Sequence, residues 1–357
     1  ADWIGVYLRG TKIGYSSIEE RAGGWRGAPG KQVLTQSVIK AELLGQQLDV
    51  TVASHSHYNR NGDAQRMEYW LASQGRESHV VVVASEGKLD VIAELAGNIT
   101  KKEIEVPAGA RIVSDPSTEL LGTEGLKSEE FEFYVFDPNV LDLVKGTAKY
   151  EGKAETEIGD VKVMAHVLLI EDPRAPITAY VTDTGDLIKA IGPLGMEMFP
   201  ESEKDAKNIS NNPAVGADIA YATSIELASA IRNEYSFESL QYRISTKNNR
   251  KWLSDDHQSA IVDAQGTLLE IHPVKPNPEE AVSIDRAGQL QPKWTKPESR
   301  VSVNDPEIVK LAKEIVGNET NVVKAAELIR RRVNRMIRTN AGIGVLRDST
   351  EILETKE

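Results

Sequence analysis

Alternation of apolar and polar residues dominates the first two hundred positions. In the stretch QVLTQSVIKAELLGQQLDVTVASHSHYN, Val33 and Ile39 share one register, and Leu48 and Val52 share another. Short turn sequences such as RGTK and TDTGD separate these runs. A repeat of two places successive side chains on opposite faces of a strand. The pattern predicts about ten strands in an antiparallel meander with one face open to water.

The composition becomes polar in PESEKDAKNISNNPAVGA, where Asn-Asn-Pro interrupts any regular element. This change predicts a domain boundary. A second set of strand-like runs follows, SLQYRIS and HQSAIVDAQGTLLEIHP, with DAQG as the turn between two strands. A block of roughly 85 residues suits a small β-sandwich. We therefore expect an antiparallel β-rich domain at 1–203 and a small β-sandwich domain at 204–302.

The repeat changes to helical spacing after the proline-punctuated linker QPKWTKPESRVSVND. Asn304–Glu307 is typical of a helix start, since Asn or Asp caps free N–H groups and Pro fits the first helical position. Gly317 ends this helix, and a second helix is predicted to begin near Thr320. Its apolar residues form one stripe: Val322, Ala326, Ile329, Val333, Met336 and Ile337.

The predicted fold class is mainly β: a large curved antiparallel β-sheet domain, then a small β-sandwich, then a C-terminal α-helical segment at 303–357. A helix pair of about 35 residues is too small to form a core of its own. Its apolar stripe therefore needs cover, either from the preceding β block or from protein that this sequence lacks. Core packing explains the stripe better than a ligand surface does.

The charge of the chain argues against one class of partner. The formal net charge is -12, from 42 basic and 54 acidic residues. Non-specific nucleic-acid binding needs a cationic face, so no nucleic-acid partner is expected. The arginines of the second helix are a local exception that fits a solvated or partner-facing side. No stretch approaches the ~18 apolar residues of a bilayer helix, so no membrane span is expected.

Cysteine is absent, which excludes disulfides, thiolate metal sites and a cysteine nucleophile within these residues. The chain opens with ADWIGVYLRG and enters a strand almost at once. Such a start is typical of a chain whose signal peptide has been removed, although trimming would give the same start. We expect a secreted or periplasmic protein.

The histidines are the main candidates for chemistry. His55 and His57 lie two positions apart on one predicted strand, a spacing that can hold a metal, but no third ligand is evident nearby. Two polar residues on a wet sheet face are the simpler interpretation. His79 and His166 flank apolar strands and fit the boundary of the core. The serines lack the Gly-x-Ser-x-Gly elbow. We predict no catalytic residue, no cofactor-binding residue and no metal site.

The aromatic residues allow a binding function. They lie mainly in the β blocks, and they include Trp3, Trp25, Trp70, Trp252 and Trp294. A curved antiparallel sheet with an aromatic-lined concave face can hold a lipid or a peptide. Core packing explains the same residues.

The last 53 residues resemble the entry into a transglutaminase-like cysteine domain of the bacterial kind. The pieces DPEIVKLAKEIVG, AAELIRRRVNRMI and DSTEILETKE match that family's helix starts in order and spacing. WIGVYLRGTKIGYS and VTDTGDLIKAIGPLGMEM look like the β-rich region that precedes such domains. The resemblance implies a nucleophilic Cys shortly after Glu357, and the His and Asp of its triad further downstream. Residues 303–357 would then be the incomplete start of that domain.

Two functions follow as expectations. The first is a non-catalytic N-terminal region, truncated before the catalytic Cys, which positions substrate for a downstream Cys-His-Asp domain or regulates it. Its partners would be that catalytic domain and a protein or peptide substrate, and the chain itself would not be an enzyme. The alternative is a periplasmic or secreted binding or carrier protein that uses the curved β-sheet to hold an apolar ligand.

Overall fold

The computed structural model of the chain describes residues 1–95, 98–113, 121–122, 125–126, 130–158, 161–209, 218–224, 237–245, 252–298, 300–338 and 347–356. Spatial proximity of Cα atoms groups the chain into two compact units. Unit 1 comprises Ala1–Ser224, Lys296–Lys310 and Met336–Glu357, and unit 2 comprises Ile225–Thr295 and Leu311–Arg335. The division into domains at 1–203, 204–302 and 303–357 stays a prediction.

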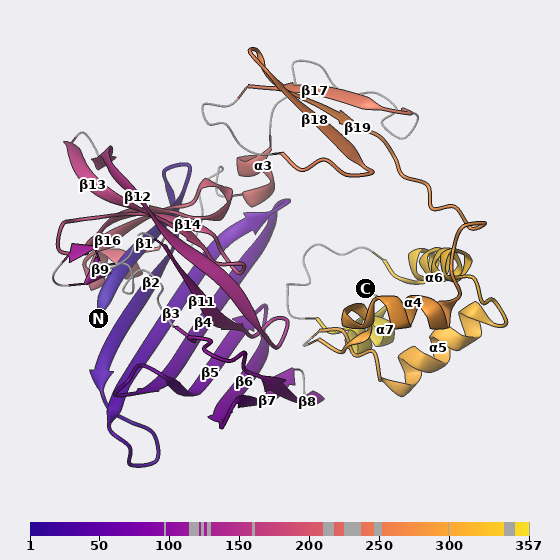
Figure 1. Cartoon of the computed structure of the whole chain (residues 1–357), viewed down its shortest axis with the longest axis horizontal. Helices are drawn as coiled ribbons and strands as arrows, with labels where there is room; N and C mark the ends of the chain where they lie inside the picture. Colours follow the sequence, from indigo (N-terminus) through magenta and orange to yellow (C-terminus); the bar gives the residue numbers. More distant parts are fainter. Residues whose placement is uncertain are drawn as a thin grey trace. The chain divides into compact units, whose positions relative to one another are not determined.

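The mainly β fold is confirmed, with one large antiparallel sheet in unit 1. This sheet has 14 strands in the order β11-β12-β13-β14-β15-β16-β1-β2-β3-β4-β5-β6-β7-β8 (Figure 1). Two short strands, β9 (Leu121–Gly122) and β10 (Gly125–Leu126), pair separately. The large sheet consists of β1 (Asp2–Leu8), β2 (Thr11–Ala22), β3 (Gly30–Leu43), β4 (Gln46–Asn59), β5 (Ala64–Ser73), β6 (Arg76–Ser85), β7 (Lys88–Leu95), β8 (Asn98–Glu105), β11 (Glu130–Asp137), β12 (Asp142–Ile158), β13 (Val161–Glu171), β14 (Ile177–Val181), β15 (Leu187–Ile191) and β16 (Glu197–Glu201).

Tight turns make the strands more numerous than the alternation predicted. Arg9 and Gly10 connect β1 to β2 with φ of 49° and 77°, and both values lie in the left-handed region. Leu44 and Gly45 connect β3 to β4 in the same way, with φ of 53° and 76°. Such two-residue turns follow the twist of the flanking strands. Only their glycine is visible as a turn signal, because the first residue of each turn is not a typical left-handed residue.

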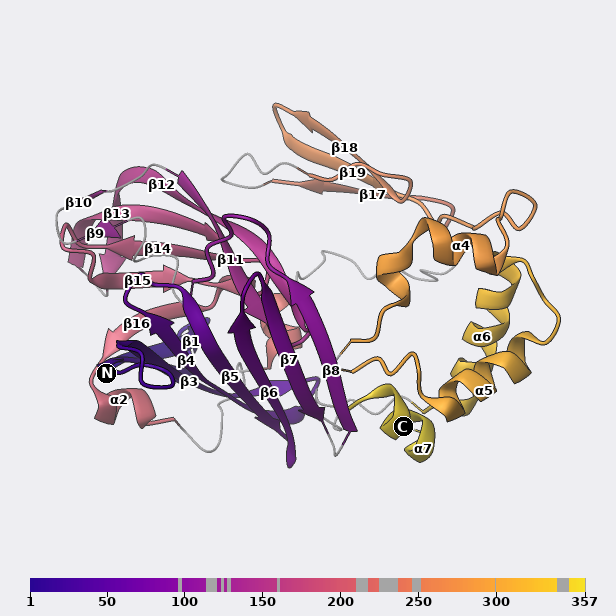
Figure 2. The ribbon, with the colours of Figure 1, turned by 60° about the horizontal axis from the view of Figure 1, so that its bottom comes forward.

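The edge strand β11 is covered on both of its faces. Phe133 and Val135 belong to a buried cluster with residues of β12 to β15. Phe136 belongs to a second cluster with Val82 and Val91, from β6 and β7. The sheet therefore curls until β11 lies against the inner face of β5 to β8 (Figure 2). One buried cluster packs on each face of β11.

The free edge of β11 is also partly paired. Val113 N donates to Tyr134 O at 3.0 Å, and Tyr134 N donates to Arg111 O at 2.8 Å. These bonds form a parallel bridge between the segment after β8 and β11. Pairing of this kind protects an edge that would otherwise attract strands of other chains.

Unit 2 contains a small antiparallel sheet in the order β17-β19-β18. Its strands are β17 (Leu240–Ile244), β18 (Gln258–Asp263) and β19 (Gly266–Ile271). The predicted DAQG turn connects β18 to β19. The described strands of this block form a single sheet, so the second layer of the expected sandwich is not among the residues that the structure describes. Ile261 and Val262 are 60% and 63% exposed, as a thin sheet requires.

The helices lie mostly in the C-terminal part. The segments are α2 (Glu203–Lys207), α3 (Ile219–Thr223), α4 (Ile284–Leu290), α5 (Pro306–Val316), α6 (Val322–Met336) and α7 (Ser349–Thr355), with 3-10 turns η1 (Pro193–Gly195) and η3 (Pro292–Thr295). The predicted start of α5 is confirmed, because Asp305 Oδ1 accepts hydrogen bonds from Glu307 N and Ile308 N, both at 3.0 Å. None of the described helices is both long and apolar enough to cross a membrane.

Candidate functional site

Helix α6 begins at a polar cap that the sequence encodes. Asn321 Oδ1 accepts hydrogen bonds from Val323 N and Lys324 N, each at 3.1 Å. Asn321 Nδ2 also donates to Pro278 O at 2.7 Å, so the cap is tied to the segment before α4. A capping Asn satisfies amide groups that have no partner inside the helix. The start of α6 is thereby fixed within unit 2.

The charged side of α6 is organised by one carboxylate. Glu327 accepts hydrogen bonds from Arg330 Nε at 2.7 Å and from Arg331 Nε at 2.5 Å. The hydrogen bonds from Arg330 and Arg331 lower the pKa of Glu327 to about 2. Spacings of three and four residues bring these side chains together on a helix surface. All three are well exposed, so this group orders the side chains rather than stabilising the fold appreciably.

The apolar side of α6 is only partly covered. Ala325 is the one buried residue among the described residues of α6, and α5 has none. Val333 of the predicted stripe is 38% exposed, and Leu328, which lies outside the stripe, is 41% exposed. An amphipathic helix of a globular protein normally turns such a stripe toward a core. The stripe that the sequence predicts is therefore present, but unit 2 does not bury it.

Three hollows border α6. The largest, about 950 Å³, lies between Pro276, Pro278 and the helix residues Val322, Ala326 and Leu328. A second, about 560 Å³, is lined by residues of α4, α5 and α6 that include Ile284, Val316 and Ile329. A third, about 400 Å³, carries three arginines beside Leu311 and Ile315: Arg331, Arg332 and Arg335. We call the residues of α6 that line these hollows the α6 surface. The α6 surface combines apolar residues, such as Val322 and Ile329, with the arginines Arg331, Arg332 and Arg335.

Helix α7 is attached to the large sheet by an ion pair. Arg76 Nε, at the start of β6, donates to Glu351 Oε1 at 3.0 Å, and Arg347 Nε donates to the same oxygen at 3.2 Å. Asp348 Oδ1 caps α7 by accepting a hydrogen bond from Glu351 N at 2.7 Å. The hydrogen bond from Arg76 lowers the pKa of Glu351. This contact joins residues 275 positions apart, so no local sequence pattern could reveal it.

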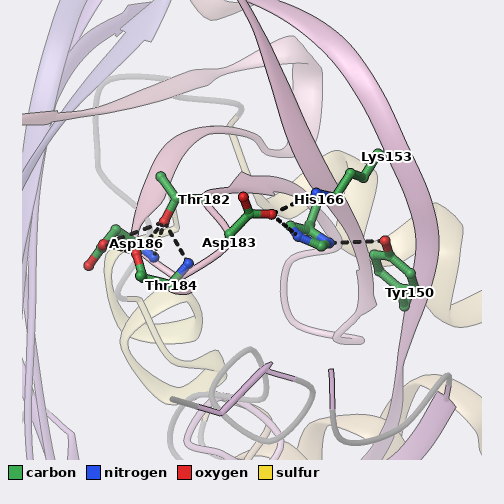
Figure 3. Close-up of polar contacts among 7 residues, drawn as sticks. All are labelled: Tyr150, Lys153, His166, Thr182, Asp183, Thr184 and Asp186. Atoms are coloured by element: carbon green, nitrogen blue, oxygen red, sulfur yellow. Dashed lines mark hydrogen bonds and ion pairs between the residues drawn. The ribbon is translucent and has the colours of Figure 1, made fainter. Parts of the chain in front are cut away.

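His166 lies in a chain of polar contacts that Figure 3 shows. Its Nε2 donates to Asp183 Oδ1 at 2.8 Å, and its Nδ1 lies 2.9 Å from Tyr150 Oη. Lys153 Nζ donates to the same Asp183 oxygen at 2.6 Å. Hydrogen bonds from Lys153 and His166 lower the pKa of Asp183. A bulge at Gly152, with φ of 96°, shifts the register so that Lys153 stands opposite His166.

This cluster links two hairpins rather than forming a catalytic triad. Both ring nitrogens of His166 are engaged, and among the residues that the structure describes the hydroxyl bonded to the ring is the phenol of Tyr150. A nucleophilic triad needs a hydroxyl or thiol on the imidazole nitrogen that faces the substrate. Asp183 itself sits in the TDTGD turn, where Asp186 N donates to Thr182 Oγ1 at 3.0 Å. The arrangement fastens this turn to the β12–β13 hairpin.

His55 and His57 share one face of β4, as their spacing predicts. Their ring centroids are 4.4 Å apart, and Trp25 covers His57 at 5.3 Å. Burial and the neighbouring His55 and Arg66 lower the pKa of His57. His55 Nε2 contacts Gln32 Oε1 at 3.0 Å. No group of three His, Cys, Asp or Glu side chains in the described part of the chain could hold a metal ion.

The other histidines and the tryptophans are not gathered into a site. His79 stacks on Trp70, with ring centroids 5.2 Å apart. His257 and His272 are connected through their backbones, since His272 N donates to His257 O at 3.0 Å. Trp70 pairs with His79 in the register, on the face opposite to the buried Met67 and Val82. The inner face at these strands is therefore lined by aliphatic side chains and Tyr69 rather than by tryptophan.

Comparisons with known proteins do not identify a family or a function for the chain. No protein-family model matches the chain, and no curated protein matches it. A solved structure, the beta-barrel-like protein of the domain of unknown function DUF1849 from Brucella abortus, is similar at a TM-score of 0.40 and 12% sequence identity. The match covers 56% of this chain and 94% of that chain. At this level of similarity it says nothing about what this chain does.

Proposed function

We propose that this chain is the non-catalytic N-terminal region of a transglutaminase-like protein. The observation that carries the proposal is the incomplete cover of apolar residues on α6: Val333 of the stripe is 38% exposed, and Leu328, which lies outside the stripe, is 41% exposed. In that family the matching helices open the catalytic domain, so further protein of the same domain would cover them. The hollows beside α6 leave room for such cover.

Covering Leu328 and Val333 would stabilise the protein by an amount that can be estimated. Complete burial of a Leu or Val side chain contributes about 1.5–3 kcal/mol. Leu328 and Val333 have lost about 60% of their exposure already, so further cover would add roughly 2 kcal/mol for the two together. This is enough to favour association within one polypeptide, where the two parts are held close.

The role of the large sheet in this proposal is to position the catalytic segment. Helix α7 lies within DSTEILETKE, the piece that resembles the run-up to the nucleophile. Arg76 holds Glu351 of this helix against the rim of the sheet. The sheet would thus orient the entry to the Cys-His-Asp domain and present or restrict a protein or peptide substrate there. The chain has no cysteine, so it would be inactive by itself.

The test compares this chain with the same chain extended by its downstream coding sequence. The extended protein should crosslink or cleave peptides, and residues 1–357 should not. Leu328→Glu should leave the unfolding free energy of residues 1–357 within ~0.5 kcal/mol, as at an exposed site. In the extended protein it should destabilise by about 2 kcal/mol or more, since a carboxylate would be buried without a partner.

Asn334→Glu is the matched control, because Asn334 is an exposed residue of α6 that lines none of the hollows described above. It should leave both proteins unchanged. Strong destabilisation of residues 1–357 by Leu328→Glu would contradict the proposal, because Leu328 would then already belong to a closed core. A downstream sequence without Cys, His and Asp would contradict it as well.

A second candidate function is the holding of an apolar ligand by the curved sheet. The observation in its favour is a pocket of about 290 Å³ on β4 to β7, lined by aliphatic residues, Tyr69, Trp70, Ser78, the β11–β12 turn and Arg300. Ligand sites are concave and mostly apolar, with a few polar groups that fix orientation. Retention of a hydrophobic probe by unit 1, and its loss when the pocket is filled, would test this function.

A further inference from the structure

We infer that the pocket on β4 to β7 binds a medium-chain aliphatic carboxylate, with its chain on the sheet and its carboxylate at Arg300. This inference rests on the second candidate function, the holding of an apolar ligand, and names the ligand class. It is independent of whether a catalytic domain follows the chain.

The wall of the pocket follows from strand register. Val52 on β4 pairs with Leu71 on β5, which pairs with Ser78 on β6, which pairs with Leu95 on β7. Directly paired residues point to the same face of an antiparallel sheet. Val50 and Val80 lie two positions along their strands from Val52 and Ser78, so they add to this face. The result is a mainly aliphatic strip across four strands, in which Ser78 supplies a hydroxyl and Tyr69 an aromatic ring.

The strip is open to a ligand. Val52 is 38% exposed although it lies on the face that carries the buried core of β5 to β8. Its neighbours Val80 and Leu95 are 2% and 4% exposed, so the opening is confined to one end of the strip. An apolar chain laid on this strip would remove Val52 from water, which is favourable.

The polar end of the pocket carries a positive charge. Arg300 and Asn139 line it, and Arg300 Nη2 donates to Asn139 Oδ1 at 2.6 Å. The side-chain contact orients the guanidinium among the residues that line the pocket. A guanidinium presents five donors in a planar fork that matches a carboxylate. Ser78 provides a further hydroxyl within the lining.

A buried polar atom lies beside the same strip. Ser73 pairs with Val50 in the register and is 3% exposed. Among the residues that the structure describes, its Oγ has no hydrogen-bond partner. Buried hydroxyls without partners are uncommon and call for an explanation such as a missing ligand or water. Ser73 is not among the residues that line the pocket, so it lies beside the proposed ligand site and is not part of it.

The size of the pocket sets the length of the ligand. A methylene group takes up about the space of a water molecule, ~30 Å³ in the liquid. A pocket of about 290 Å³ therefore admits roughly ten carbon and oxygen atoms. Octanoate has this size, whereas a long-chain fatty acid would leave much of its chain outside.

The test is calorimetric titration of the full chain with octanoate and, separately, with 1-octanol. Both should bind, and octanoate should bind more tightly. Arg300→Gln should weaken octanoate about tenfold or more, since a charge-assisted hydrogen bond is lost, and should change 1-octanol less than about twofold. Val52→Phe fills the pocket from a residue that is already 38% exposed, so it should weaken both ligands without unfolding the protein.

Arg21→Gln is the matched control, because Arg21 forms an exposed ion pair with Glu19 on β2, away from the pocket. It should change neither affinity. Binding of 1-octanol without preference for octanoate, or octanoate binding that Arg300→Gln leaves intact, would overturn the carboxylate inference but keep the apolar-ligand function. Absence of binding by both ligands, or binding that Val52→Phe leaves intact, would overturn both.

Discussion

Gly146 shows how closely single residues pack in the large sheet. It lies on β12 opposite Phe133, which is 0% exposed. A Cβ at Gly146 would lie 2.5 Å from Phe133 Cζ and 2.8 Å from Glu171 O. Both atoms are fixed, one by the core and the other by the β12–β13 pairing. Glycine is required here by space rather than by backbone conformation.

Gly146→Ala should therefore destabilise unit 1 by about 1–3 kcal/mol, the usual effect of overpacking a core. Urea denaturation followed by near-ultraviolet circular dichroism measures this change. Gly288→Ala is the control, because no atom lies within 4 Å of a Cβ at Gly288 in α4. It should be neutral or stabilising by up to ~1 kcal/mol. An unchanged midpoint for Gly146→Ala would mean that the strands are less tightly packed than described.

The Arg76–Glu351 ion pair makes the attachment of α7 depend on pH. Because Arg76 lowers the pKa of Glu351, the pair stabilises the folded state above the ordinary carboxyl pKa, ~4.3. This stabilisation is lost as the pH falls through the lower pKa of the folded state. Amide exchange of residues 348–356, corrected for intrinsic rates, should therefore rise in acid.

Arg76→Gln should remove most of this dependence and raise exchange at pH 7 by roughly fivefold, equivalent to ~1 kcal/mol for a partly exposed pair. Arg21→Gln, which breaks the more exposed Arg21–Glu19 pair, should have no effect on these amides. If Arg76→Gln leaves the exchange of α7 unchanged, the ion pair does not hold the helix.

Residue positions were predictable from sequence only where the alternation of side chains along a strand decides which face they lie on. His55 and His57 lie on one face because two positions separate them, and the structure confirms this. The cover by Trp25 depends on the path of the β2–β3 loop. The Lys153–Asp183 contact depends on a bulge at Gly152. Neither the loop path nor the bulge is visible in the alternation of residue types.

At the scale of elements, the cap of α6 makes a clear prediction. Asn321 supplies an acceptor for two backbone amides and a donor for Pro278 O. Asn321→Ala should lower the stability of α6 by about 1–2 kcal/mol. Hydrogen exchange of residues 322–326 measures the loss. Asn321→Asp keeps the acceptor but not the donor. Its exchange rates should therefore lie between those of the unaltered protein and those of Asn321→Ala. Equal exchange in all three proteins would contradict the assigned cap.

The helices and strands themselves were largely predictable from the sequence, but which of their faces are buried was not. The helices α5 and α6 begin within two residues of their expected starts, because Asn, Asp and Pro leave a local signal. The strand class also follows from alternation. The two-sided burial of β11 does not, since it arises from the curl of a 14-stranded sheet over distant strands.

At the scale of the whole molecule, the two units differ in how they bury apolar surface. Unit 1 has three buried clusters, which include fully buried residues such as Phe133, Leu168 and Val82. In the described part of unit 2, Leu269 and Ala325 are the buried apolar residues. Unit 1 therefore has the core of an independent domain. Unit 2 is the part that gains most from further cover.

This difference underlies the central claim that the α6 surface contacts the remainder of a transglutaminase-like domain. The claim concerns the stability of one helix, so it is measurable without knowledge of the substrate. An uncovered helix opens locally at low free energy, whereas a helix in a closed core opens only with the whole domain.

Hydrogen exchange of residues 322–336 tests the claim most directly, measured in residues 1–357 alone and in the protein extended by its downstream coding sequence. The account predicts at least tenfold slower exchange in the extended protein, since cover adds more than ~1.4 kcal/mol to the opening free energy. Equal exchange in the two proteins, with α6 already protected in residues 1–357, would contradict it.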